Sequence, residues 1–278
     1  MTRRTARPLG PAAWAVLPLL ALIALAALWP GLLEHQAPDA VNPVDALQGP
    51  GGAHWFGTDQ LGRDIYSRVV AGARPSLLTG LGVTALALAG GSALALLGLV
   101  GGRVVDGIVM RITDVLFAFP GILLALLVVT VLGRGTAHAT LAIGCAFVPG
   151  FTRLVRSQAL VVREADYVRA AVVCGQRHLA VHLRHVLPNA LPPLLVLATV
   201  NIGTAILSGA SLSFLGLGPQ PSDPEWGAML AQSKDFLGTT WPLAVFPGAA
   251  LTLTVLAVNV VGRDLQRRFE GRLPGGSR

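Results

Sequence analysis

The sequence predicts an all-α protein that crosses a membrane several times, and three observations support this. The chain of 278 residues is 53% hydrophobic and only 13% charged, whereas an ordinary soluble domain carries about 25% charged residues. Its mean hydropathy is +0.64. Several nearly uncharged runs reach about 18 residues or more, which is long enough for a helix to span a bilayer. We therefore expect a polytopic membrane protein.

Hydropathy predicts six transmembrane helices. They are expected at Ala12–Trp29, Ser76–Gly101, Val109–Leu132, Ala137–Phe151, Leu191–Leu217 and Trp241–Val261. The first run resembles a signal peptide, but it exceeds the roughly 7–15 residues of such an apolar region, so we expect a retained helix. The fourth is the weakest because it is short and contains Pro149 and Gly150.

The basic residues predict that both termini lie in the cytoplasm. In this arrangement sixteen of the 21 basic residues are on the inner side: Arg3, Arg4, Arg7, Arg103, Arg111, Arg153, Arg156, Arg163, Arg169, Arg177, Arg184, Arg263, Arg267, Arg268, Arg272 and Arg278. The outer segments hold Arg63, Arg68, Arg74, Arg134 and Lys234. The predicted division is a cytoplasmic N-terminus (1–11), a first helix (12–29), an extracytoplasmic segment (30–75), a transmembrane domain (76–262) with a cytoplasmic loop at 158–190, and a cytoplasmic tail (263–278).

A basic, polar stretch from Val161 to Pro193 interrupts the apolar pattern. Its first part predicts a short helix with a small apolar face formed by Ala170, Ala171 and Cys174, ended by Gly175. A second helical segment is expected over 177–186, stopping at Leu187-Pro188. Such a small-faced helix suits a groove on another protein. An amphipathic helix lying on the membrane surface is the alternative, and the pattern alone leaves both open.

Two predicted spans contain unusual residues: small residues that allow close helix packing, and polar residues that suggest hydrogen bonds between helices or a water-filled path. The second span contains Gly80, Gly82, Gly90, Gly91, Gly98, Gly101 and Gly102. These glycines allow close approach either within the chain or to a second membrane subunit. The fifth span carries Asn201, Thr204, Ser208 and Ser211, which predict either a translocation path or hydrogen bonds between helices.

The loop residues Ala170-Ala171, Gly175 and Leu187-Pro188 resemble the EAA loop of ATP-binding cassette (ABC) importer permeases. Further motifs agree in order: GTDQLGRDIYSRVVAGARPSL (57–77), MRITDVLFAFPG (110–121), LRHVLPNALPPLL (183–195), SLSFLGLG (211–218), EWGAML (225–230) and FPG (246–248). Together, over about residues 55–264, they resemble the C-type permease subunit of dipeptide, oligopeptide and nickel importers. Arg169 stands where the family has glutamate.

The resemblance implies a type I ABC importer fold, with a five-helix core and one N-terminal helix, in a bacterial inner membrane. It implies half of a translocation pore for peptides or for nickel and other metal chelates. The expected partners are a B-type permease, two ABC ATPase subunits that carry the ATP and Mg²⁺, an extracytoplasmic substrate-binding protein and membrane lipid. The expected ATPase-coupling loop comprises Arg169, Ala170, Ala171, Gly175, Leu187 and Pro188.

Other classes of function are less well supported by the residues. The basic residues do not form a stripe interleaved with aromatics, which disfavours nucleic-acid binding. Lys234 is the only lysine and is not part of a Walker A loop, so energy must come from a partner. An ATP-independent secondary transporter or channel should carry ionisable residues within its spans, and the predicted spans are almost free of them. An intramembrane enzyme would need a nucleophile and base, or metal ligands, at membrane depth, and the only histidine in the predicted spans is His138, near an outer end.

Three polar clusters have alternative interpretations. His178, His182 and His185 are spaced to share a helix face, as a metal site requires, but a solvated or partner-facing helix is preferred. The carboxylates Asp59 and Asp64, with Arg63 and Arg68, predict ion pairing at the membrane edge rather than acid–base catalysis. Arg111 and Asp114 are spaced as a helix-surface pair.

Overall fold

The computed structural model describes residues 10–219 and 222–270, and its regular elements are helical. The predicted cytoplasmic segments 1–11 and 263–278 therefore lie partly outside the described residues. Within the described chain the long helices are α1 (Pro11–Leu28), α2 (Ile65–Ala118), α4 (Thr136–Arg163), α7 (Leu187–Phe214) and α9 (Pro242–Glu270). Shorter elements are α3 (Gly121–Leu132), α5 (Asp166–Val173), α6 (His178–Val181), α8 (Trp226–Ser233) and the single turns η1 (Pro30–Leu32), η2 (Pro43–Asp45), η3 (His182–Val186) and η4 (Lys234–Phe236).

Five of these helices are long and apolar enough to cross a membrane, and α3 is a shorter apolar helix of 12 residues. The predicted third span, Val109–Leu132, is not one continuous helix. It is divided between the end of α2 and α3, with the break at Phe119 and Pro120. Proline has no N–H to donate and disfavours a helical conformation in the residue before it. The hydropathy prediction missed this break because it averages over many residues and is insensitive to one proline.

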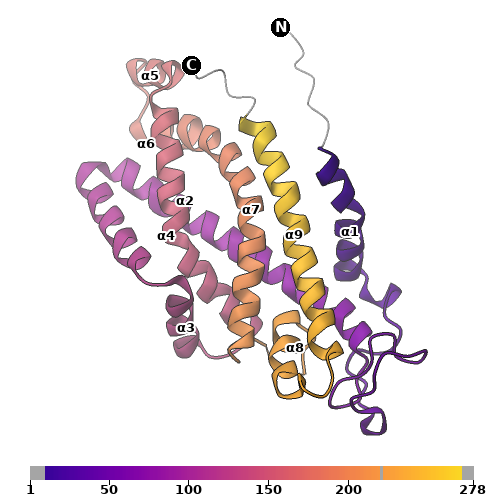
Figure 1. Ribbon diagram of the computed structural model, residues 1–278. Helices are drawn as coiled ribbons and strands as arrows, with labels where there is room; N and C mark the ends of the chain where they lie inside the picture. Colours follow the sequence, from indigo (N-terminus) through magenta and orange to yellow (C-terminus); the bar gives the residue numbers. More distant parts are fainter. Residues whose placement is uncertain (1–9, 220–221, 271–278) are drawn as a thin grey trace. The chain divides into compact units, whose positions relative to one another are not determined.

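Helix α2 consists of two segments that meet at Gly102. This glycine has a φ of +82°, which is not helical. The chain folds back there, as Figure 1 shows, so that a Cβ on Gly98 would lie 2.9 Å from Asp106 Oδ1. Glycine accepts a positive φ without a steric penalty. The predicted boundary between the second and third spans therefore corresponds to this fold-back.

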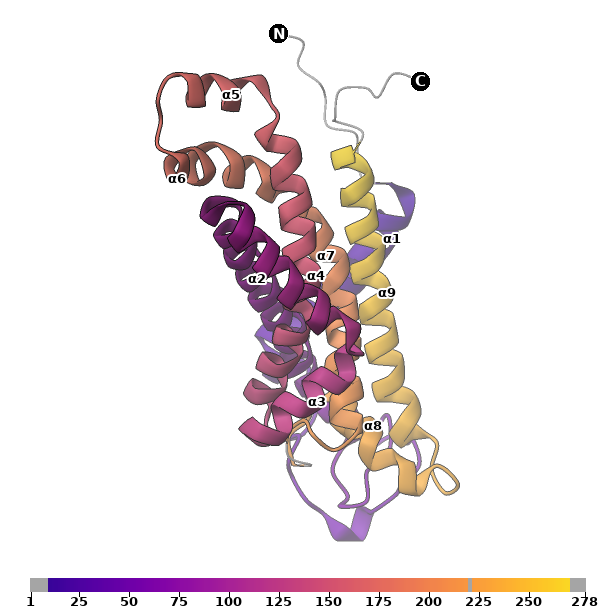
Figure 2. The same ribbon diagram turned by 90° about the vertical axis from the view of Figure 1, so that its left-hand side faces the viewer.

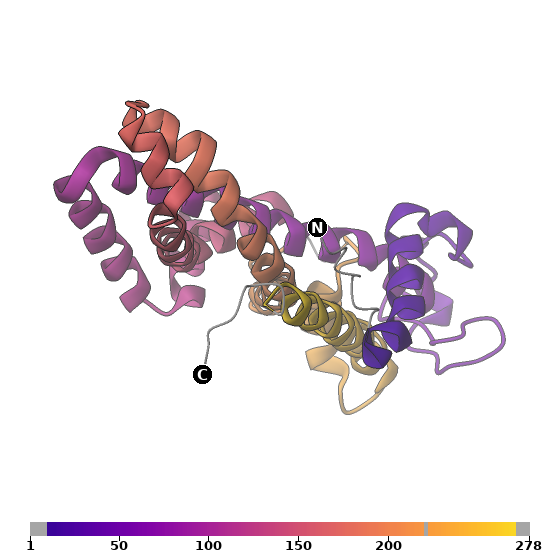
Figure 3. The ribbon, with the colours of Figure 1, turned by 90° about the horizontal axis from the view of Figure 1, so that it is seen from above.

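The described chain forms two compact units, each with its own core. The first takes the residues up to Gly80, Arg134–Thr136 and the residues from Thr199 onward, whereas the second takes Leu81–Gly133 and Ala137–Ala198. In the first unit, α1 and α8 both contact α9, and α1 lies beside α9 in Figures 1 and 3. Gly10 N–H donates to Asp264 Oδ1 (3.3 Å), which fixes the start of α1 beside the last turns of α9.

The core of the first unit is apolar and includes aromatic side chains. Its buried members are Ala26, Ile65, Val70, Ala73, Ile206, Ala210, Trp226, Met229, Leu243 and Leu251. The rings of Phe56 and Phe246 stack at 3.8 Å against this cluster. Trp226 is fully enclosed, and its indole N–H donates to Val69 O (2.9 Å). This satisfied donor lets the largest side chain of the cluster be buried.

The second unit relies on small residues where α2 packs against α4. A Cβ on Gly91 would lie 2.6 Å from Phe151 Cβ and 2.8 Å from the Phe151 carbonyl carbon. Equivalent carbons on Gly82 and Gly90 would lie 2.9 Å from Thr140 and Val148 side chains. The glycines of the second span therefore serve packing within the chain at these positions, which was one of the two interpretations left open by the sequence.

Candidate functional site

The predicted coupling loop contains a short helix with a well-defined C-terminal end. Helix α5 is followed by Gly175, whose N–H donates to Val172 O (3.0 Å), and by Gln176, whose N–H donates to Ala171 O (3.2 Å). Gly175 has a φ of +77°. These two bonds and the positive φ form a Schellman end. The prediction that Gly175 terminates this helix is confirmed.

Helix α5 has one side packed against other helices of the second unit, to which it belongs, and one side exposed. Val168 and Ala171 belong to a buried cluster whose other members are Ala159, Val181, Val186 and Ala190. Tyr167, Arg169, Ala170 and Val173 are exposed. The sequence predicted that Ala170 and Ala171 share one outward face, and this is wrong for Ala171, which packs inward. Figure 2 shows α5 and α6 together beyond the end of α4.

Arg169 forms an ion pair within the loop. Its Nη2 donates to Glu164 Oε2 at 2.6 Å, and both side chains are exposed. The hydrogen bond from Arg169 holds the pKa of the Glu164 carboxyl below its usual range. The positive charge of Arg169 therefore has a negative neighbour five residues earlier.

Leu187-Pro188 does not stop the second loop helix, contrary to the sequence prediction. The chain continues from α6 through a π-helical turn, η3, directly into α7. In that turn Leu187 N–H donates to His182 O, and Asn189 Nδ2 donates to His185 O at 2.6 Å. Pro188 has no N–H, and a wide turn with a side-chain donor supplies other partners for the freed carbonyls.

The three loop histidines are not arranged as a metal site among the described side chains. His182 is buried, and His185 Nε2 lies 3.0 Å from Gln176 Oε1. The side chain of His178 is outside the described residues. No group of three or more histidine, cysteine or acidic residues suited to a metal ion occurs in the part of the chain that the structure describes.

The four candidate path residues lie along one stripe of α7. Thr204 is exposed, and Asn201, Ser208 and Ser211 are half-buried. The opposite side of the helix is buried in the first unit, through Ile206, Ala210 and Leu212 among others. Ser211 Oγ donates to Leu207 O of its own helix at 2.8 Å. The spacing of three and four residues thus places the polar groups on the side away from the apolar core.

Asp59, Arg63 and Arg68 form a buried ionic network in the first unit. Arg63 Nε donates to Asp59 Oδ2 at 2.6 Å, and Arg68 Nε lies 3.8 Å from the same oxygen. Arg68 Nη1 also donates to Pro38 O (3.2 Å) and Ser222 O (3.3 Å). The prediction of ion pairing is confirmed.

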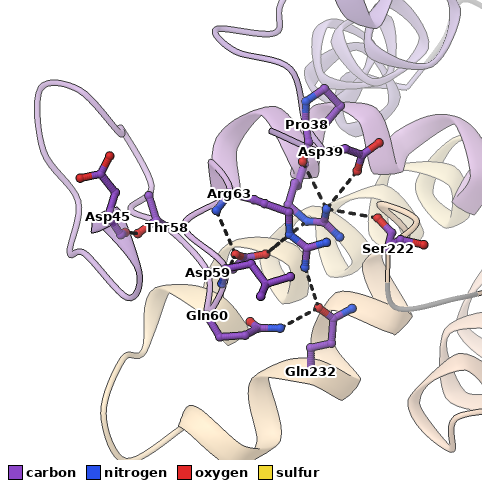
Figure 4. Close-up of polar contacts among 11 residues, drawn as sticks. Pro38, Asp39, Asp45, Thr58, Asp59, Gln60, Arg63, Ser222 and Gln232 are labelled. Atoms are coloured by element: carbon purple, nitrogen blue, oxygen red, sulfur yellow. Dashed lines mark hydrogen bonds and ion pairs between the residues drawn. The ribbon is translucent and has the colours of Figure 1, made fainter. Parts of the chain in front are cut away.

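Sequence reasoning missed the distant partners of this network. Figure 4 shows Gln232 of α8, whose Oε1 accepts from Arg63 Nη2 and Gln60 Nε2, both at 3.2 Å. Asp64 caps α2 by accepting from Ser67 N–H (2.8 Å), and its other oxygen lies 3.0 Å from His54 Nδ1. The only signal was the clustering of charged residues before an apolar helix. It could not identify a partner in α8.

Two further ion pairs join α2 to α4 within the second unit. Arg156 donates twice to Asp106, at 2.7 and 2.6 Å. Arg153 Nη2 donates to Asp114 Oδ1 at 2.6 Å, and its guanidinium lies 4.5 Å from the centre of the Phe117 ring. The predicted Arg111–Asp114 pair is wrong, because the bend at Gly102 brings α4 within reach of Asp114.

Comparisons with known proteins agree with this architecture. The family model of the binding-protein-dependent transport system inner membrane component matches residues 85–274. The dipeptide transport system permease protein DppC of Alkalihalophilus pseudofirmus is 42% identical over 249 residues, which are 90% of this chain and 82% of that protein. The glutathione transport system permease protein GsiD of Escherichia coli O6:K15:H31 is 42% identical over 257 residues, covering 92% and 84%.

Solved structures support the same fold. A structure of the MetNI methionine ABC transporter has a TM-score of 0.59 at 19% identity, covering 72% of this chain and 95% of the other. An amino acid ABC transporter has a TM-score of 0.55 at 15% identity, covering 72% and 94%. The chain therefore has the fold of a type I ABC importer permease and is a multi-pass inner membrane protein. It belongs to the family of binding-protein-dependent transport system inner membrane components and is an ABC importer permease.

Proposed function

We propose that this permease forms one half of the translocation pore of a short-peptide importer. Two ABC ATPase subunits, a B-type permease and an extracytoplasmic binding protein complete it. The relatives that are 42% identical are named for dipeptide and glutathione transport, which favours short peptides over nickel or other metal chelates. The single structural observation that supports the mechanism is the two-sided character of α5. One side of the helix is exposed, and Val168 and Ala171 on the other side are buried in an apolar cluster.

The proposed orientation is N-in and C-in, with the sequence-based division at residues 12–29, 30–75 and 76–262. Sixteen of the 21 basic residues fall on the inner side in this arrangement. The bond from Gly10 N–H to Asp264 Oδ1 supports the two ends lying on the same side, because it holds the start of α1 beside the end of α9; the basic residues alone favour the cytoplasmic side. The loop that carries α5 is then cytoplasmic.

The proposed docking surface is the exposed side of α5, formed by Tyr167, Arg169, Ala170 and Val173. Small and apolar groups allow a helix to enter a groove closely, and Arg169 offers a fixed, paired charge to the ATPase. Val168 and Ala171 fix the helix to the second unit. Gly175 ends the helix, and Leu187-Pro188 connects it to α7 without an intervening loop.

In the proposed cycle, ATP and Mg²⁺ bind only to the partner ATPases. ATP binding brings the two ATPases together and moves the two coupling helices, and this opens the pore outward to receive substrate from the binding protein. Hydrolysis by the partners then resets the inward-open state. The stripe of Asn201, Thr204, Ser208 and Ser211 is proposed to face the path, since its polar groups lie opposite the apolar core of the first unit.

The experiment that tests this proposal compares two adjacent alanines. The whole complex is reconstituted in liposomes, and uptake of dialanine and of glutathione is measured with ATP hydrolysis. Ala170→Leu should abolish uptake while leaving the unfolding temperature unchanged, because Ala170 is exposed. Ala171→Leu should instead lower the unfolding temperature, since Ala171 packs inward. Val161→Leu, at an exposed position before the loop helix, is the control.

Wild-type uptake by an intact Ala170→Leu complex would contradict the docking surface. Failure of the wild-type complex to import either peptide, with ATP hydrolysis still stimulated by the binding protein, would contradict the substrate class alone.

A further inference from the structure

A polar pocket of about 570 Å³ lies within the first unit, beside α8. It is lined by the turn before α4, the end of α7 with the residues up to Pro219, Asp223, α8 and η4. Its charged and polar lining includes Arg134, Ser213, Asp223, Gln232 and Asp235. Pockets of about 300–1,000 Å³ with a few convergent polar groups are typical of small-molecule sites.

The wall formed by the end of α7 is held in a defined conformation. Gly216 has a φ of +81°, and its N–H donates to Ser213 O (2.9 Å), while Leu217 N–H donates to Leu212 O (3.2 Å). Lys234 Nζ donates to Phe214 O at 2.6 Å and lies 3.7 Å above the Phe214 ring. The α7 end is therefore closed by a Schellman turn and a lysine.

The wall formed by α8 is held by the buried ionic network. Gln232 Oε1 accepts from both Arg63 Nη2 and Gln60 Nε2. Glu225 caps α8 by accepting from Gly227 N–H and Ala228 N–H, each at 2.9 Å. The α8 side chains are thus oriented before any ligand enters, which reduces the entropic cost of binding.

Both signs of charge are present in the lining. Arg134 is the basic residue among the described lining residues, and Asp223 and Asp235 are the acidic ones. A guanidinium binds a carboxylate through two parallel hydrogen bonds, and aspartate is a partner for an ammonium group. A ligand that carries both a carboxylate and an ammonium group complements this lining better than a ligand of one charge.

The pocket lies at the same end of α7 as the last residue of the polar stripe, Ser211. Ser213, which lines the pocket, is buried and is two residues beyond Ser211, so these two side chains face different sides of the helix. In the proposed orientation this end of α7 is extracytoplasmic, which is where substrate arrives.

From these observations we infer that the pocket is an acceptor subsite for a dipolar short peptide, with Arg134 binding the α-carboxylate and Asp223 and Asp235 binding the α-ammonium group. This inference rests on the proposed function, because it assumes that substrate enters from this side. It adds a substrate-selective site to the permease itself. The concave shape and mixed charge favour a small dipolar ligand over a loop of the binding protein.

The test measures dipeptide binding to the whole transporter, in nanodiscs and without its binding protein, by saturation-transfer NMR. The probes are dialanine, its C-terminal amide and its N-acetyl derivative. Dialanine should bind about tenfold more tightly than either blocked form, because each block removes one charge-assisted contact. Arg134→Gln should raise the Kd of dialanine about tenfold, to the Kd of the amide.

Three variants complete the design. Asp223→Asn combined with Asp235→Asn should abolish the difference between dialanine and its N-acetyl derivative. Arg134→Lys should give an intermediate Kd, because lysine keeps the charge without the planar fork. Arg74→Gln, at an exposed arginine outside the lining, should change nothing. An unchanged unfolding temperature for each variant excludes misfolding as the cause.

Equal dialanine affinity for the wild type and Arg134→Gln, or no dialanine binding to the wild type, would overturn the inference. It would also be overturned if Arg134→Gln lowered only the stimulation of ATP hydrolysis by the binding protein, since the pocket would then be a protein contact. Binding that depends on Arg134 in a complex that imports no dipeptide would refute the proposed function and leave the subsite in place.

Discussion

Two ion pairs of equal length have opposite surroundings in this protein. In the first unit, Arg63 Nε lies 2.6 Å from Asp59 Oδ2, and the two side chains are only 5% and 4% exposed. In the proposed coupling loop, Arg169 Nη2 lies 2.6 Å from Glu164 Oε2, and the side chains are 63% and 61% exposed. The two pairs therefore have the same N–O distance but differ in how far their side chains are exposed to solvent.

The difference indicates two different roles. A buried charge that loses its partner cannot be solvated, so its removal is costly. An exposed charge is solvated in either state, and water and salt screen its partner. The Asp59–Arg63 pair therefore helps to hold the first unit together, whereas the Glu164–Arg169 pair stays solvated at the surface.

The largest effect is expected from breaking the buried pair. Arg63→Met leaves Asp59 without its closest cation and removes a bond to Gln232. The free energy of unfolding should fall by about 3–5 kcal/mol. The measurement is denaturant unfolding of the purified chain in mixed micelles, followed by circular dichroism.

Arg74→Met is the matched control for that variant, because Arg74 is an exposed arginine of α2. Its free energy of unfolding should change by less than about 0.5 kcal/mol. A loss below about 1 kcal/mol for Arg63→Met would show that the buried network does not hold the unit together.

A second variant extends the comparison to apolar packing. Gly91→Ala places a Cβ 2.6–2.8 Å from Phe151 atoms in α4, and overpacking of this kind should cost about 1–3 kcal/mol. Gly107→Ala, in the second segment of the same helix, meets no atom within 4 Å. It should stabilise by up to about 1 kcal/mol, because alanine favours a helix over glycine. Equal unfolding midpoints for the two variants would contradict the packing described for α2 and α4.

A smaller effect is expected at the junction between the proposed coupling loop and α7. Asn189→Ala removes the side-chain donor to His185 O, and the local cost should be about 0.5–1.5 kcal/mol. Hydrogen exchange should speed up in residues 182–190 and remain unchanged in α9. Asn189→Asp keeps the volume but not the donor, so it should behave in the same way; protection equal to wild type in both variants would refute the bond's role.

The smallest effect on stability is expected from the exposed pair. Arg169→Gln should leave the unfolding temperature unchanged, while ATPase docking, measured by co-purification, should weaken. The pKa of Glu164 is lowered from 4.5 by the hydrogen bond from Arg169. A carboxyl with a lowered pKa contributes stability above its ordinary pKa and loses it as the pH falls through the lowered value. The contribution of this pair to stability should therefore be constant between pH 6 and 8. A difference in unfolding temperature between wild type and Arg169→Gln that changes with pH in that range would contradict this assignment.

The sequence predicted local features of the fold well, because they depend on neighbouring residues. The apolar runs became helices α1, α4, α7 and α9 and parts of α2, and Gly175 ended α5. The third span and the Leu187-Pro188 stop were predicted incorrectly. In both cases the prediction failed at a proline. Pro120 interrupted a helix that was predicted to continue, whereas Pro188 was accommodated by a π-helical turn where the helix was predicted to stop.

The candidate site was predicted in part. The four α7 residues do share a stripe, as the helical spacing requires, and their role in the path remains a prediction. Ala171 was assigned to the wrong side, since helical periodicity within eight residues does not say which side meets the rest of the protein. The mixed-charge pocket was not predicted, because its lining comes from segments as far apart as Arg134 and Asp235.

By itself, the sequence determined that this chain is a helical membrane protein with a polar loop between apolar segments, because span length and hydropathy are properties of contiguous residues. Only the tertiary structure decided the partners of each charge. Asp114 pairs with Arg153, 39 residues away, rather than with Arg111, and Arg63 reaches Gln232, 169 residues away. The physical reason is that a charge pairs with whatever the folded backbone brings near, and burial then makes that pairing costly to break.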